Sequence, residues 1–162
     1  MNIARCLHSQ GKTVELVFSA DSVLTLDDIG DINQVPQNVK LNLNPYVIPT
    51  PAWLLAPFPI GRRNRRQVDN SLDDILNIGL TYNLPGALSH RDAFYELAGG
   101  DKNSGGGHRL PHLLLDVTLA VLRGETNYDI IQRTEAALQV LATKSRVVIE
   151  LETTNFKKAL RP

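Results

Sequence analysis

The densest charge in the sequence is a run of arginines between residues 61 and 67. Planar guanidinium groups donate paired hydrogen bonds to phosphate and carboxylate oxygens. We therefore expect this run to contact nucleic acid or an acidic partner, together with two lysines of the C-terminal tail. The alternative is a solvated loop whose charge is balanced by the aspartates that follow it. The candidate contact residues are Arg62, Arg63, Arg65, Arg66, Lys157 and Lys158.

Residues that could support catalysis are fewer. Asp116 interrupts an apolar stretch shortly after His108 and His112, which gives a hydrolase-like enzyme as a weaker alternative. The glycine-rich segment 99–108 lacks the spacing of a phosphate-binding loop, so we expect a flexible connection there. The sequence predicts no catalytic residue, no metal site and no cofactor. The single cysteine, Cys6, cannot form an internal disulfide.

An apolar, proline-rich arm is predicted over residues 45–67. It holds five of the nine prolines and the only tryptophan of the chain. Proline removes backbone donors and fixes φ, so we expect an extended segment and neither a central strand nor an ordinary helix. Such arms gain free energy by burying large apolar side chains in another subunit. The residues predicted to dock are Tyr46, Trp53, Leu54, Phe58 and Ile60.

Hydrophobic periodicity predicts the elements that must position these residues. Residues 3–19 are typical of a β-hairpin around Gly11, and 39–43 and 147–151 alternate as strands. Helices are predicted over 72–80, 90–98, 111–123 and 126–143 from their caps, prolines and glycines. The fold class is therefore α+β. A small antiparallel sheet, made of the N-terminal hairpin and the C-terminal strand, packs with about four helices.

Length and composition limit the class of protein. The 162 residues are 43% hydrophobic and 21% charged, which predicts a single domain over 1–162. Basic and acidic residues number 17 each, so a generic polyanion binder is disfavoured. No apolar run approaches the ~20 residues that cross a bilayer, and no secretory signal is recognised. We expect a cytoplasmic location or a place within an assembled particle.

The function predicted from these features is assembly without catalysis. The protein is expected to be a subunit of a larger oligomer or particle, for example of a virus or phage, that docks through the apolar arm. Its partner is expected to be another protein or a second copy of the chain. A nucleic-acid-contacting module built on the arginine run is the alternative. No membrane and no small-molecule substrate is expected.

Overall fold

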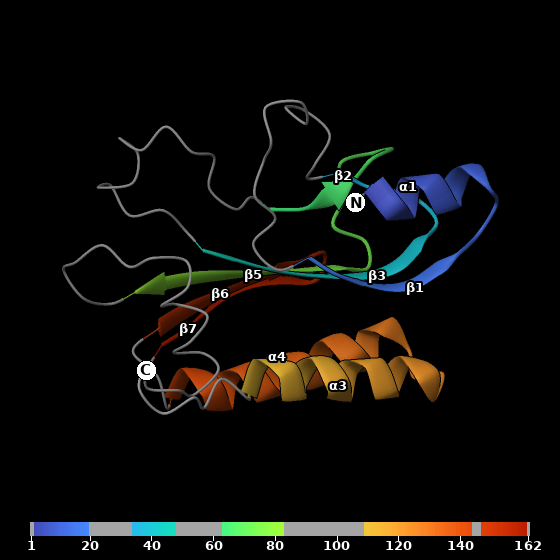
Figure 1. Cartoon of the computed structure of the whole chain (residues 1–162). Coiled ribbons are helices and arrows are strands. Elements are labelled where there is room, and N and C mark those ends of the chain that lie inside the picture. Colours follow the sequence, from blue (N-terminus) through green and yellow to red (C-terminus); the bar gives the residue numbers. More distant parts are fainter. Residues whose placement is uncertain (1, 20–33, 48–62, 83–108, 144–146, 162) are drawn as a thin grey trace, which may run out of the picture.

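A computed structural model describes residues 2–19, 34–47, 63–82, 109–143 and 147–161. A five-stranded sheet in the order β1-β3-β5-β6-β7 forms the middle layer (Figure 1). The helices α3 and α4 cover one face, while α1 and the two-stranded sheet β2-β4 lie over the other. The helices are α1 (Asn2–Ser9), α3 (Arg109–Leu122) and α4 (Asn127–Thr143). The strands are β1 (Val14–Phe18), β2 (Gln34–Val35), β3 (Val39–Val47), β4 (Arg65–Arg66), β5 (Ile75–Tyr82), β6 (Val147–Thr153) and β7 (Phe156–Leu160).

The predicted sheet and helix count are wrong, although the class is mixed α and β. The described residues form three helices and a mixed sheet in which β1, β3 and β5 are parallel. β6 runs antiparallel to both of its neighbours, β5 and β7, and the strands β3 and β5 separate it from β1. The strands predicted over 39–43 and 147–151 are confirmed as parts of β3 and β6. The helix predicted over 90–98 and the loop 99–108 lie outside the described residues.

The first half of the hairpin predicted over 3–19 is instead the helix α1. Gly11 has a φ of +66°, and Lys12 N donates to Leu7 O, which is the hydrogen bond of a Schellman cap. A glycine with positive φ serves a tight turn and a helix end equally well, so it did not distinguish the two. Ala4 buries the inner face of α1 against the strands.

The helix predicted over 72–80 is the strand β5. Ser71 and Asp74 resemble a helix cap but belong to a turn, in which Asp74 has a φ of +55° and Ser71 Oγ accepts from Asp73 N. From residue 75 to residue 80 both faces of β5 are buried. Apolar residues therefore occupy almost every position, and the alternation that identifies a half-buried strand is lost.

Pro45 lies inside β3, the strand between β1 and β5. Asn42 N donates towards β5, whereas Leu43 O accepts from Ser19 N on the β1 side. Donors alternate along a strand, so the nitrogen of residue 45 faces the β1 side. Among the described residues the paired register with β1 ends at Leu43, so the missing N–H breaks none of the described pairs. Residues 45–47 of the predicted arm thus end β3, and 48–62 lie outside the described residues.

The helices predicted from Pro111 and Thr126 are confirmed as α3 and α4. Gly124, with a φ of +73°, ends α3, and Thr126 Oγ1 caps α4 by accepting from Asp129 N over 3.2 Å. α3 packs against β1, and α4 packs against β6 and β7. Neither these helices nor α1 is long and apolar enough to cross a membrane.

Candidate functional site

A buried polar cluster lies on the sheet face that points away from α3 and α4. Leu41 and Leu43 of β3 pack in the core with both helices, so the alternating Asn42 and Asn44 point to the opposite face. Asn77 of β5 is level with Asn44 on the same face. Ser19 and Asn64 complete a group of five buried residues, which we call the asparagine clasp: Ser19, Asn42, Asn44, Asn64 and Asn77.

The side chain of Asn77 forms hydrogen bonds with both backbone groups of Asn64, the N–H and the C=O. Asn77 Oδ1 accepts from Asn64 N over 2.8 Å, and Asn77 Nδ2 donates to Asn64 O over 3.0 Å. The same Oδ1 accepts from Asn44 Nδ2 over 2.8 Å. A carboxamide carries donors and an acceptor, so one side chain can replace a strand partner for a segment outside the sheet.

The side chain of Asn64 connects this residue to β1 and β3, the other two parallel strands. Its Nδ2 donates to Ser19 Oγ and to Asn42 Oδ1, both over 2.9 Å. Asn42 Nδ2 donates to Ser19 Oγ and to Val17 O, both over 3.1 Å. The clasp therefore joins the end of β1, the middle of β3, β5 and residue 64. Its buried side-chain atoms all have partners, so their hydrogen bonds offset the cost of removing them from water.

Four charged or phenolic residues extend the clasp along the sheet: Tyr46, Arg63, Arg65 and Glu152. Arg63 Nε donates to Tyr46 Oη over 3.1 Å and lies 3.2 Å from Glu152 Oε2 of β6. Arg65 Nη2 lies 3.8 Å from the other oxygen of Glu152. Tyr46 and Arg63 stand directly outside the ends of the apolar part of the arm. The described residues on the two sides of 48–62 therefore meet at one place on the sheet.

The Arg66 side chain points into the protein, and most of its hydrogen-bond donors bond to other residues of the chain. Its side chain is only 11% exposed; Nε donates to Asp73 O over 2.8 Å and Nη1 to Val39 O over 2.6 Å. The remaining contacts are with Pro36 O, Lys40 O and the Asp74 carboxylate. Arg66 thus joins the turn before β3 to the loop before β5, and few of its donors remain for a ligand.

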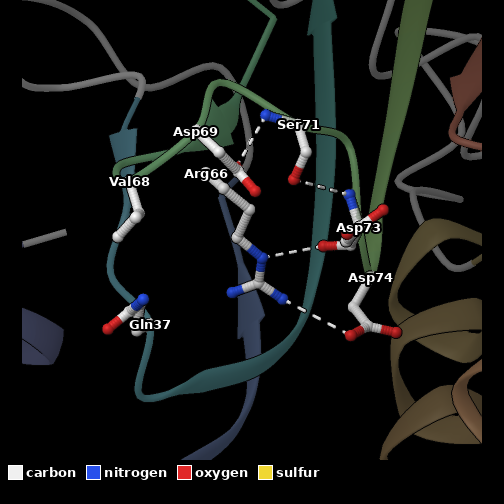
Figure 2. Close-up of a pocket in the computed structure, with 7 residues that line it drawn as sticks. All are labelled: Gln37, Arg66, Val68, Asp69, Ser71, Asp73 and Asp74. Carbon is white, nitrogen blue, oxygen red and sulfur yellow. Dashed lines mark hydrogen bonds and ion pairs between the residues drawn. The ribbon is translucent and has the colours of Figure 1, made fainter.

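An open pocket of about 280 Å³ surrounds Arg66 (Figure 2). In Figure 2 the guanidinium reaches across the pocket to Asp73 and Asp74. Asp69 Oδ1 accepts from Ser71 N over 2.9 Å, and this hydrogen bond lowers the pKa of the Asp69 carboxyl. Most of the polar residues that line the pocket thus bond to one another, namely Arg66, Asp69, Ser71, Asp73 and Asp74. Across the described ranges, no group of three or more histidine, cysteine or acidic side chains could hold a metal ion.

The structure places three of the predicted contact residues on one sheet face, Arg63, Arg65 and Lys157, and separates the other described ones from them. Arg63 and Arg65 lie near Glu152, whereas Lys158 Nζ donates to Glu135 Oε1 of α4 over 2.8 Å. Lys157 is the register partner of Glu152, so it lies on the same face as Arg63 and Arg65 and points away from Lys158. Arg66 is largely buried. Arg62 lies outside the described residues.

Of the predicted docking residues, only Tyr46 is described, and it is buried. The others lie outside the described residues: Trp53, Leu54, Phe58 and Ile60. The asparagines were not predicted as a site at all. Part of their signal was present in the sequence, since Asn42 alternates with leucines in the strand predicted over 39–43 and Asn44 directly follows that strand. Alternation of this kind is typical of a half-buried strand, whose polar side chains face water.

Removal of the Asn77 side chain tests the clasp. Asn77→Ala is expected to lower the free energy of unfolding by about 2–3 kcal/mol, because the buried N–H and C=O of Asn64 lose their partners. Urea denaturation measures the change. Gln132→Ala, at an exposed position of α4, is the control and should change stability by less than about 0.5 kcal/mol. An Asn77→Ala protein as stable as the control would contradict the assigned role.

Burial also gives Tyr46 a pH-dependent contribution to stability. Desolvation raises the pKa of its phenol above the ordinary 10.0, and the neighbouring Arg63 acts in the opposite direction. The unfolded chain therefore loses this proton first as the pH rises. The contribution is complete below pH 10.0 and is lost as the pH rises through the raised pKa.

Tyr46→Phe is accordingly expected to flatten the fall in unfolding free energy that begins near pH 10.0. Urea denaturation at a series of pH values measures the slope for the wild type and the variant. Tyr128→Phe removes an exposed phenol from α4 and leaves the Tyr46 contribution in place, so it is the control. Equal slopes for wild type and Tyr46→Phe would show that Tyr46 makes no such contribution.

In the described residues, the polar face of the sheet bonds separate segments of the chain to one another. Its amides, its phenol and its ion pairs bond to one another across four segments. Networks of this kind fix loop ends because each lost partner leaves a buried polar group unpaired. No protein-family model, curated protein or solved structure matches this chain.

Proposed function

We propose that this protein is a non-enzymatic assembly subunit whose copies associate through the apolar segment 48–62 to form a larger oligomer or particle. The main support is that one patch of polar side chains holds both ends of that segment. Tyr46 lies just before the segment and Arg63 just after it, and Arg63 Nε donates to Tyr46 Oη over 3.1 Å. The asparagine clasp then fixes the next residue, Asn64.

A fixed base favours docking by a segment of this composition. Four prolines restrict the chain between the two ends, and restricted chains lose less conformational entropy when they bind. Large apolar side chains gain free energy when a partner buries them. The side chains proposed to enter a neighbouring copy are Trp53, Leu54, Phe58 and Ile60.

The alternatives have less support. Phosphate binding by the arginine run would have to compete with Glu152 for Arg63 and Arg65, and Arg66 is mostly buried. Asp116, the acid of the hydrolase alternative, is exposed on α3, whereas catalytic acids are usually shielded from water. Assembly through the apolar segment requires none of these side chains to bind a ligand, and it leaves the contact of Arg63 with Tyr46 in place.

Light scattering over a range of protein concentrations tests the proposal. We expect the wild-type chain to have a mass above the 17.9 kDa of the monomer, and Trp53→Ser/Phe58→Ser to lose much of the added mass. Val68→Ser, which removes an exposed apolar side chain from the β4–β5 loop, is the control and should assemble like the wild type. Assembly that is unchanged by the double substitution would contradict the proposal.

A further inference from the structure

Helix α3 presents a stripe of leucines to solvent. Leu115, Leu119 and Leu122 are 54%, 37% and 78% exposed. Their spacing of four and then three residues places them on one side of the helix, as in the seam of a coiled coil. The opposite side of α3, with Val117 and Ala120, is buried against the sheet. α3 is therefore apolar on two sides, and its outer side is open at the edge of the molecule (Figure 1).

Two charges flank this stripe on the same side. Asp116 and Arg123 are both exposed and stand seven residues apart, so they share one face of the helix. Two turns are too far for an ion pair within one helix, where residues three or four apart meet. Within the described part of the chain, no hydrogen bond or ion pair engages either side chain.

We propose that two copies of this chain pair through their α3 helices in an antiparallel arrangement, with the two-fold axis beside Leu119. Antiparallel pairing places the charged flanks opposite one another, so Asp116 lies beside Arg123 of the partner subunit, and the second such pair follows by symmetry. A parallel pair would instead set the charged flank against the uncharged flank that contains Thr118. The charge pattern therefore favours a second copy of the chain, in one orientation.

This surface goes beyond the proposed function, because it is separate from the segment 48–62. An isologous contact closes at two copies and cannot extend further by itself. A seam of about two helical turns is short, so the pair is expected to be weak and to depend on concentration. Combined with a second kind of contact, it would make dimers the building blocks of a larger assembly.

Sedimentation equilibrium of the full chain carrying Trp53→Ser/Phe58→Ser isolates the α3 contact. We expect a monomer–dimer equilibrium that Leu119→Glu weakens about tenfold or more, because two carboxylates would meet at the axis. Ile3→Glu is the matched control, because it also charges an exposed apolar position of a helix, here α1 on the other side of the sheet. The control should leave the dimer unchanged.

Charge exchange tests the orientation in the same background. Asp116→Arg and Arg123→Asp are each expected to weaken the dimer several-fold, and the two together should restore it. Circular dichroism confirms the fold of each variant, which is expected to survive because the positions are exposed. A dimer that persists in Leu119→Glu, a double exchange that recovers nothing, or a monomer at all concentrations would overturn the inference.

Discussion

The buried hydrogen bonds of the asparagine clasp determine how the chain is held outside its hydrophobic core. The core lies between the sheet and the helices α3 and α4, where Leu43, Leu80 and Leu151 are fully buried. The other face of the same strands carries amides, which cannot be buried without partners. Each amide therefore fixes its neighbours, and the position of Asn64 follows from that of Asn77.

The two faces of the sheet therefore make different contributions to the fold. The helix face supplies the larger apolar core, and the other face adds a smaller apolar cluster beneath α1 and β2, formed by Ala4, Val35, Val39 and Ile75. The amides on that second face supply specific attachment for residue 64. Arg66 extends the attachment, because its largely buried side chain donates to Asp73 O in the loop before β5 and to Val39 O at the start of β3. The proposed assembly would involve both sides of the sheet, because the residues that flank 48–62 are held on one side and the leucines of α3 lie on the other.

Local signals predicted part of the fold. Thr126 and Gly124 mark helix boundaries by hydrogen bonds and backbone angles that act within a few residues, so α3 and α4 could be predicted. The strand β5 could not, because burial on both faces removed its alternation. The glycine at position 11 indicated a positive φ, which the structure has, but it did not show whether a turn or a helix end required that angle. The pairing of β6 with β5 depends on contacts far apart in sequence, which periodicity does not report.

The candidate site was predictable only in part for the same reason. The arginines were visible as a cluster, but whether a guanidinium meets solvent or carbonyl oxygens depends on tertiary structure, as Arg66 shows. The asparagines carry no motif, since their role arises from the register that places Asn77 beside Asn44. The spacing of residues along the chain therefore does not reveal such a network.

Amide hydrogen exchange at Asn64 tests the clasp most directly. This residue lies outside any strand, yet its N–H donates to the buried Asn77 Oδ1 over 2.8 Å. We predict exchange as slow as that of the amides of β5, because opening this bond requires the polar network to open. The amide of Val68, in the exposed turn that follows β4, provides the fast reference. Exchange at Asn64 as fast as at Val68 would contradict the account, since the end of the segment would then not be held.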